Sequence, residues 1–321
     1  MKIARIAINE IEKFGMDNNI CSSVFGTARW LSIFGNNITV YGIFNDDGRQ
    51  NGMFYTYSRK KNGLKFFVNA PYTPHNALSF INHSENKANR LSQNKRVLTE
   101  LASFIDSLPC SEVSLAFPFT CTDMQPFIWK KFKVIPNYTY HIDLSVSMEN
   151  MLSNLSAERR NSINKCLKDG IIVESCNKMQ VIKDMVVKMN NRKQNNLYEQ
   201  YVDKILFEFA DVNNSFAFVA RKEDKIIATA FCIKDMNSAY YLLGSYDKEN
   251  KHNGAGSAVI WECMMHAKKL GLKLFDMEGS MIAEVEKFFR SFGGTLTPFY
   301  TINKAKFPLE LLLKFIKREI F

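Results

Sequence analysis

The sequence predicts an α/β protein in which strands and helices form two domains of similar kind. The chain has 321 residues, and an ordinary globular domain has about 100–200. Apolar residues make up 46% of the chain and charged residues 23%, which is typical of a folded protein and excludes a disordered or collagen-like chain. An internal repeat favours a duplicated domain with a mixed sheet.

The repeat relates residues 113–144 to residues 272–304. Both segments run from a strand through a short loop and an aromatic-rich helix to a strand that contains Tyr-Thr. The phenylalanine near the end of the helix and the tyrosine of the last strand are eight residues apart in both copies. We therefore expect an N-terminal domain over 1–145, a C-terminal domain over 146–306 and an amphipathic helix over 307–321.

β-branched and aromatic residues predict the strands of the first half, and Asp47-Gly48 is typical of a hairpin turn. Apolar residues at helical spacing, followed by Pro109, predict one long helix. We expect the helix at 95–108 and strands at 37–44, 51–57, 64–74, 112–117 and 139–145.

The second half begins with a helical segment over 148–170. Ser156 is a typical N-cap residue and breaks this segment, and Gly170 is a typical residue after a helix end. Further helices are expected at 178–190, 198–210, 254–271 and 281–291, where apolar residues recur on one face. Strands are expected at 171–175, 215–221, 225–234, 238–247, 272–277 and 297–304.

The net charge of +10 is spread over both halves and suits an anionic ligand, such as a nucleotide, a CoA ester, an RNA end or a phospholipid surface. No apolar run reaches the ~18 residues of a membrane span, and the charged N-terminal segment does not match a signal peptide. We expect a cytoplasmic protein without a DNA partner. The seven cysteines are scattered without zinc-binding spacing, so no metal is expected.

The sharpest local feature lies between the predicted strand at 238–247 and the predicted helix at 254–271. Asn253-Gly254-Ala255-Gly256-Ser257 opens that helix. Glycine lets the backbone approach an anion closely, and the free N–H groups at a helix start favour a phosphate. The segment is therefore a candidate pyrophosphate-binding loop, and the alternative is a flexible helix start without a ligand.

The order of these elements resembles the GNAT acyltransferase fold. Lys251-His252-Asn253-Gly254-Ala255-Gly256 is similar to the CoA-binding pattern Q/R-x-x-G-x-G/A of that family, with Lys251 in place of Gln or Arg. The resemblance implies that Gly254, Gly256 and Ser257 contact the pyrophosphate of an acyl-CoA. Lys251 and Asn253 would flank it, with Ala255 between the two glycines.

A second resemblance, to the Fem-type branch of tandem GNAT proteins, covers most of the chain. That branch includes the peptidyltransferases of cell-wall bridge synthesis. Phe289 stands where the branch often has a Lys associated with transfer from aminoacyl-tRNA, and Lys287 and Arg290 lie beside it. The matching segments are 28–31, 69–74, Arg160–Cys166, Gly170–Val173, Phe275–Ser280, Phe288–Gly294 and Tyr300.

The reaction that the resemblance implies is acyl transfer to an amine, which needs a base for the amine and proton donors for the oxyanion and the leaving thiolate. Asp276 and Glu278 lie two apart at a predicted strand end, so they share a face if the strand continues, and they are candidates for the base or for holding the acceptor amine. Tyr246 and Tyr300 are candidates for the proton donor. The alternative for the two acidic residues is a role in helix capping or solubility, and the alternative for the two tyrosines is aromatic packing.

Candidates for binding an acceptor phosphate or carboxylate are Arg160, Lys287 and Arg290. The basic amphipathic segment at 307–321 is a candidate for contact with an anionic membrane surface, and its alternative is a helix packed on a domain. We expect an enzyme that transfers an acyl group from acyl-CoA to an amine of a small molecule or a cell-envelope precursor. Aminoacyl-tRNA-dependent peptidyl transfer and ligand binding without catalysis are the alternatives.

Overall fold

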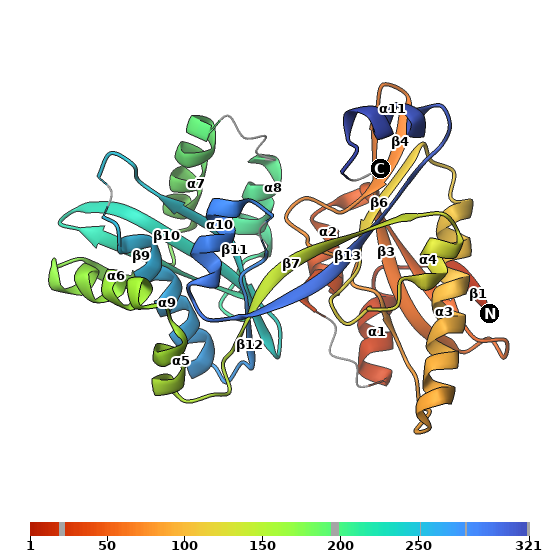
Figure 1. The fold of residues 1–321 in the computed structure, drawn as a ribbon, viewed down its shortest axis with the longest axis horizontal. Coiled ribbons are helices and arrows are strands. Elements are labelled where there is room, and N and C mark those ends of the chain that lie inside the picture. The colour runs from red at the N-terminus through yellow and green to blue at the C-terminus, as the bar shows by residue number, and fades with distance from the viewer. Residues whose placement is uncertain (19–22, 194–198, 251, 280, 320–321) are drawn as a thin grey trace. The chain divides into compact units, whose positions relative to one another are not determined.

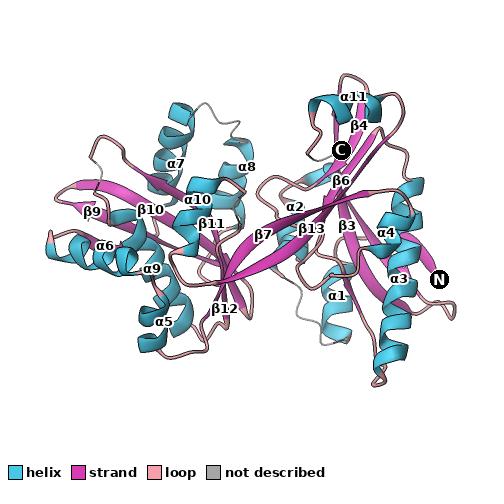
Figure 2. Ribbon diagram, viewed as in Figure 1, coloured by secondary structure: helices cyan, strands magenta, loops and turns pink. Residues whose placement is uncertain are grey.

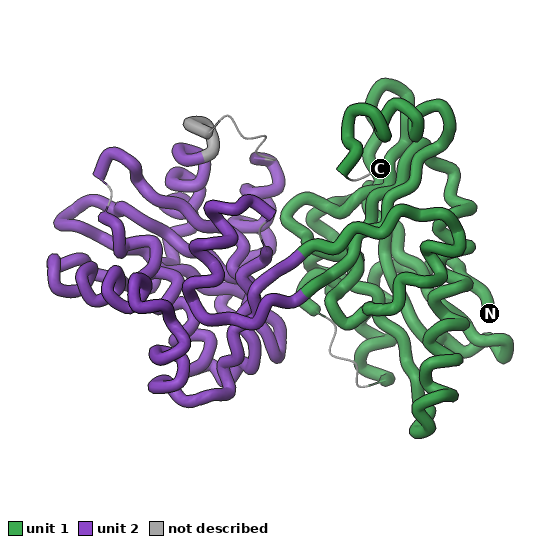
Figure 3. Tube along the Cα trace, viewed as in Figure 1, with its two compact units in different colours: residues 1–137, 298–321 green, residues 138–297 purple. Residues whose placement is uncertain are grey.

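A computed structural model describes residues 1–18, 23–193, 199–250, 252–279 and 281–319. The chain forms two compact units, each of which is described by itself. Unit 1 consists of residues 1–137 and 298–321, and unit 2 consists of residues 138–297 (Figure 3).

Unit 1 is a mixed sheet covered by helices. Its strands follow the order β1 (Lys2–Ile6), β2 (Ile38–Phe44), β3 (Gln50–Lys61), β4 (Leu64–Val68), β6 (Glu112–Ala116) and β13 (Thr295–Ala305), and the short β5 (Ser79–Phe80) pairs with β3. The main apolar core joins these strands to α3 (Lys87–Ser107) and α4 (Gln125–Trp129). The other helices are α1 (Glu10–Asp17), α2 (Ala28–Ser32) and α11 (Leu309–Ile316), with single turns η1 (Val24–Gly26) and η2 (Gly35–Asn37).

The helix α3 starts well before the predicted residue 95. Its first turns are polar and carry no apolar repeat, so the sequence pattern did not include them. Asn86 starts the helix, because its side chain accepts a hydrogen bond of 3.0 Å from the Asn89 N–H. Local capping therefore extends the helix beyond the residues that pack against the core.

The sheet of unit 2 has the strand order β7 (Lys133–Asp143, of which residues 138–143 belong to this unit), β12 (Leu274–Asp276), β11 (Ser238–Tyr246), β10 (Lys225–Lys234), β9 (Ser215–Lys222) and β8 (Ile172–Ser175). Helix α9 (Ala255–Lys269) packs against β9, β10 and β11, and α7 (Met179–Lys193) contacts β10 and β11 (Figure 2). The remaining helices are α5 (Met148–Asn154), α6 (Ala157–Lys168), α8 (Glu199–Asp203), the π-helical turn η3 (Lys204–Phe209) and α10 (Ala283–Arg290).

The predicted break between α5 and α6 is confirmed. The Ser156 side chain accepts a hydrogen bond of 3.2 Å from the Arg159 N–H, which caps α6. Gly170 follows the helix with φ +74°, a conformation that glycine adopts without strain. The serine before α6 and the glycine after it therefore determine where this helix begins and ends.

The two copies of the repeat exchange their last strands. β7 follows α4 in the first copy, and its residues 141–143 pair with β12 of the second copy. β13 follows α10 in the second copy, and its residues 301–305 pair with β6 of the first copy. The units therefore divide at residues 137/138 and 297/298 rather than near residue 145, and α11 belongs to unit 1.

Within the described ranges, no helix is long and apolar enough to cross a membrane. In the same ranges, no three His, Cys, Asp or Glu side chains gather in a way that could hold a metal ion.

Candidate active site

The strands β11 and β12 part in the middle of unit 2. They pair in parallel from Ser238 opposite Leu274 to Tyr240 opposite Asp276, where β12 ends. β11 continues to Tyr246 along β10, and the register shift at Phe231/Cys232 leaves Leu242 as an additional residue. A bulge of this kind bends the strand and increases its twist. Residues 241–246 consequently have one edge without a β12 partner.

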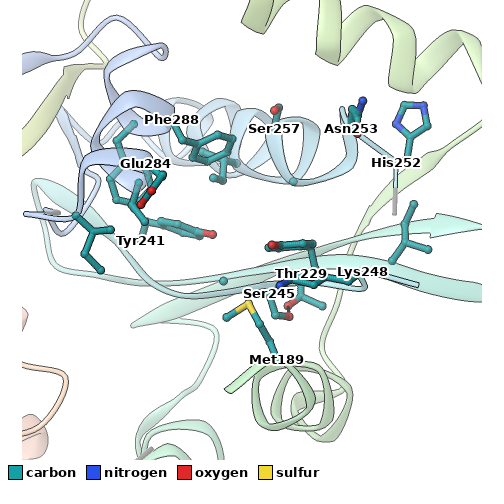
Figure 4. Close-up of a pocket in the computed structure, with 18 residues that line it drawn as sticks. Met189, Thr229, Tyr241, Ser245, Lys248, His252, Asn253, Ser257, Glu284 and Phe288 are labelled. Carbon is teal, nitrogen blue, oxygen red and sulfur yellow. Dashed lines mark hydrogen bonds between the residues drawn. The ribbon is translucent and has the colours of Figure 1, made fainter. Parts of the chain in front are cut away.

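A cavity of about 930 Å³ lies beside this open edge. Figure 4 shows it between the strands and α9, with Tyr241 reaching into it and Glu284 and Phe288 of α10 at one end. Ser257 and Asn253 lie above it, and the loop residues Lys248 and His252 lie at the other end. The lining combines apolar walls with a few polar groups, as is usual for a small-molecule site.

The start of α9 faces this cavity. Of the first N–H groups of the helix, that of Gly254 donates to His252 Nδ1 at 3.1 Å and that of Ala255 donates to the His252 carbonyl at 3.1 Å. The next two N–H groups, those of Gly256 and Ser257, lie in the first turn and have no acceptor within the helix. Both residues line the cavity. Among the described residues neither N–H group has an acceptor, so the helix presents two donors and its positive end to this space.

The two glycines of the predicted loop have different roles. A Cβ on Gly254 would lie 2.0 Å from the Ser162 carbonyl oxygen of α6, so Gly254 allows the two helices to pack closely. A Cβ on Gly256 would meet nothing within 4 Å, so Gly256 keeps open space at the cavity wall. Ala255 is buried in the core, and Asn253 lines the cavity. Lys251 lies outside the described residues.

His252 ties the loop to α6. Its Nδ1 accepts the Gly254 N–H, so the proton of the neutral ring is on Nε2, which donates to Asp169 Oδ2 over 2.9 Å. The hydrogen bond with His252 lowers the pKa of Asp169. The pair therefore holds the turn in front of α9 in a defined position.

Arg159 is a buried cation behind the start of α9. Its side chain donates to Ser257 Oγ and, over 2.8 Å, to Ser291 Oγ, and its guanidinium carbon lies 4.4 Å from the ring centre of Phe288. Burial lowers the pKa of Arg159, and no carboxylate of the described chain forms an ion pair with it. Because Ser257 Oγ accepts from Arg159, its own hydrogen is available to an anion in the cavity.

Tyr241 is one of the aromatic residues that line the cavity, and it lies toward the end formed by Glu284 and Phe288 (Figure 4). Burial raises the pKa of its hydroxyl well above the usual range, so this group stays protonated. A Cβ on Gly244 would lie 1.6 Å from the Tyr241 hydroxyl oxygen, which shows that the missing side chain makes room for it. The predicted Tyr246 also lines the cavity, but its side chain is 41% exposed.

Asp276 is the last residue of β12, and Glu278 lies beyond the strand with φ +59°, so the predicted shared strand face does not form. Neither residue lines the cavity. Asp276 accepts a hydrogen bond of 2.5 Å from Thr139 and one of 2.9 Å from the Glu278 N–H, and its Oδ2 lies 3.1 Å from His141 Nε2. Burial, together with the charge of Asp276, raises the pKa of Glu278 well above its usual range. Glu278 Oε1 is buried without a hydrogen-bond partner in the described structure.

The predicted basic residues and Tyr300 lie outside the cavity lining. Arg160 donates to the carbonyls of Leu152, Ser153 and Leu155, so it caps the end of α5. Arg290 pairs with Glu286 over 3.2 Å, and Lys287 is exposed. Tyr300 belongs to unit 1 and packs against the core of that unit.

Sequence reasoning missed Arg159, Tyr241 and Glu284. For Arg159 a signal was present, because residues 159, 163 and 166 share one helix face and the other two are apolar. A basic residue on an apolar face is buried with it, whereas Arg160 points elsewhere. Tyr241 and Glu284 carry no such pattern, since only the parted strands and α10 bring them to one cavity.

The fold is of the GNAT type: a sheet whose central strands part beside a helix that starts with a glycine loop. In agreement, residues 179–287 match the family described as "Acetyltransferase (GNAT) domain". The match covers α7, the strands β9 to β12, α9 and the first residues of α10. It supports an acyltransferase, while no curated protein sequence matches the chain.

Solved structures confirm the tandem arrangement. The crystal structure of FemX aligns over 98% of this chain and 100% of its own, with a TM-score of 0.69 and 12% identity. The C-terminal domain of a putative lysylphosphatidylglycerol synthetase from Agrobacterium fabrum aligns over 95% of this chain and 94% of its own, with a TM-score of 0.58 and 12% identity. A tandem GNAT protein from the clavulanic acid biosynthesis pathway aligns over 94% of this chain and 97% of its own, with a TM-score of 0.56 and 9% identity. The chain thus has the Fem-type tandem GNAT fold.

Proposed function

We propose that the protein is an N-acyltransferase that moves an acyl group from an acyl-CoA to an amine of a small molecule or a cell-envelope precursor. The observation that supports this most is the start of α9. The N–H groups of Gly256 and Ser257, which have no acceptor within the helix, face a cavity of about 930 Å³ next to the open edge of β11. A pyrophosphate and a thioester need these two features side by side.

The pyrophosphate would bind at the first turn of α9. Gly256 leaves the space, the two free N–H groups donate hydrogen bonds, and the Ser257 hydroxyl adds a third donor whose direction Arg159 controls. The exposed Lys248 also lines the cavity and supplies positive charge.

The thioester would lie along residues 241–246 of β11. Backbone N–H groups that point away from β10 in this segment would donate to the thioester oxygen and stabilise its charge during attack by the amine. Tyr241 would donate its proton to the sulfur as the C–S bond breaks, because its hydroxyl stays protonated and reaches into the cavity. Tyr246 is the second candidate for this proton transfer.

The acceptor amine must lose a proton before or during attack. Glu284 lines the cavity near Tyr241 and would hold the ammonium group at the entrance. Glu278, whose pKa is raised and whose Oε1 is unpartnered among the described residues, remains the candidate base, with Asp276 holding the Glu278 backbone. A base outside the cavity lining would act through water.

Transfer from aminoacyl-tRNA is less well supported by the site. Phe289 is buried and its ring packs edge-on against Tyr241, with 6.0 Å between ring centres. That position therefore builds the cavity wall and offers no cation to a charged tRNA.

The function is tested by release of free CoA thiol from acetyl-CoA and longer acyl-CoA donors in the presence of a panel of amines. Amine-dependent release by the parent, lost in Tyr241→Phe, would support the proposal. If CoA binds but no combination of acyl-CoA donor and amine releases the CoA thiol, the result would favour a ligand-binding protein. Absence of CoA binding, with amino acid transfer from charged tRNA to an amine acceptor, would refute the acyl-CoA donor.

A further inference from the structure

Helix α11 exposes an unusually apolar face. Leu313 turns inward onto Ala305, and Leu309 is partly buried with them. The large apolar residues on the other side are exposed: Phe307 by 83%, Leu311 by 50%, Leu312 by 53%, Phe315 by 80% and Ile316 by 68%. Leu311 and Leu312 lie four residues before Phe315 and Ile316, so these four side chains form one stripe along the helix, and Phe307 is exposed in the turn that precedes it. Soluble monomers seldom expose such a stripe without a partner for it.

Basic residues surround the stripe. Lys306, Lys314, Lys317 and Arg318 are exposed on and beside the helix, and of the two acidic residues there, Glu310 pairs with Lys314 over 2.7 Å. We call this set of apolar and basic residues the α11 surface.

Strand β4 and the loop before β6 extend the basic part of the α11 surface. Ser111 connects them, because its N–H donates to the Lys65 carbonyl at 2.7 Å and its carbonyl accepts from the Lys306 N–H at 2.9 Å. Burial raises the pKa of Glu112, and the positive charges of Lys317 and Arg59 partly offset this rise. Both cations therefore lie near the Glu112 carboxyl group. Figure 1 shows α11 next to β4 in unit 1.

We propose that the α11 surface binds the interface of a bilayer that contains anionic lipids. The apolar side chains would enter the region between headgroups and acyl chains, and the surrounding cations would contact lipid phosphates. The helix has eight residues and a length of about 12 Å, which suits a position in the plane of the interface. Contact with a second copy of this chain would instead bring the same cations together, which is unfavourable. This inference does not depend on the acyl-transfer reaction.

Co-flotation of the full chain with vesicles tests the proposal. We expect binding to phosphatidylcholine vesicles that contain phosphatidylglycerol, little binding to phosphatidylcholine alone, and weaker binding as salt is raised. The double variant Lys317→Gln/Arg318→Gln should bind about 30-fold more weakly, since each basic residue near the surface contributes about fivefold. Leu311→Ser/Phe315→Ser should lose binding by on the order of 100-fold.

The matched control is Val212→Ser/Met236→Ser, which removes two apolar residues that are 85% and 82% exposed in unit 2. It should bind vesicles like the parent. All these residues are exposed, so the variants should unfold at the temperature of the parent. Equal binding to neutral and anionic vesicles, no binding by the parent, or unchanged binding by Leu311→Ser/Phe315→Ser would each overturn the proposal. A dimer in solution that Leu311→Ser/Phe315→Ser abolishes would assign the surface to a second copy.

Discussion

The two glycines at the start of α9 should respond in opposite ways to the same small substitution. In Gly254→Ala, the new Cβ lies 2.0 Å from the Ser162 carbonyl oxygen and 2.9 Å from Cys166 Cβ, so α6 or α9 must move. Overpacking of this kind costs about 1–3 kcal/mol. In Gly256→Ala, the Cβ meets nothing within 4 Å, and the gain in helix propensity is up to about 1 kcal/mol.

Thermal unfolding followed by circular dichroism measures both effects. For a unit of this size, 1 kcal/mol shifts the melting temperature by roughly 2–4 °C. Gly254→Ala should therefore melt about 2–12 °C below the parent, and Gly256→Ala should melt at the parent temperature or slightly above it.

Added CoA then separates packing from binding. At about 100 times its dissociation constant, CoA should raise the melting temperature of the parent by roughly 5–10 °C. Gly256→Leu should fold but lose this rise, because its side chain fills the place of the pyrophosphate. A stable Gly254→Ala variant, or a Gly256→Leu variant that still gains stability from CoA, would refute the assignment of one glycine to packing and the other to the ligand.

Three further predictions concern the chemistry of the site. Tyr241→Phe should lower kcat by about 100-fold or more with unchanged CoA affinity, whereas Tyr246→Phe should have little effect; the reverse result would make Tyr246 the proton donor. Because the pKa of Glu278 is raised, its ionisation opposes folding as pH rises above the ordinary glutamate value, so Glu278→Gln should gain melting temperature over the parent at pH 8 and show little difference near pH 4. A constant difference at both pH values would contradict the raised pKa. Arg159→Met should weaken CoA binding roughly tenfold, as for a lost hydrogen bond to a charged group. The loss of CoA affinity in the double variant Arg159→Met/Ser257→Ala should be smaller than the sum of the losses in the two single variants. Fully additive losses of binding free energy in calorimetric titrations would show that Arg159 does not act through Ser257.

Much of the fold follows from local signals in the sequence. Ser156 and Gly170 determine the ends of α6, and the repeat of strand, helix and strand predicts the tandem fold that the structure shows. The exchange of β7 and β13 could not be predicted, because both strands have the same pattern and only long-range pairing distinguishes their partners.

The candidate site was predicted in part. The glycine loop carries a local signal, and the structure places Asn253, Gly256 and Ser257 at the cavity. The basic residues were harder to assign, because neighbouring positions on a helix face different surroundings. Arg159 is buried behind the loop, whereas Arg160 caps α5. A motif selects a segment, but helix rotation and packing decide which of its side chains reaches a ligand.

The central claim is that the N–H groups of Gly256 and Ser257 bind the pyrophosphate of a CoA ester. Amide hydrogen exchange with and without CoA tests it most directly, with pantetheine, which lacks the pyrophosphate, as the control ligand. We predict that CoA slows exchange in a peptide that covers the start of α9 and that pantetheine does not. Unchanged exchange at the start of α9 under saturating CoA would contradict the account.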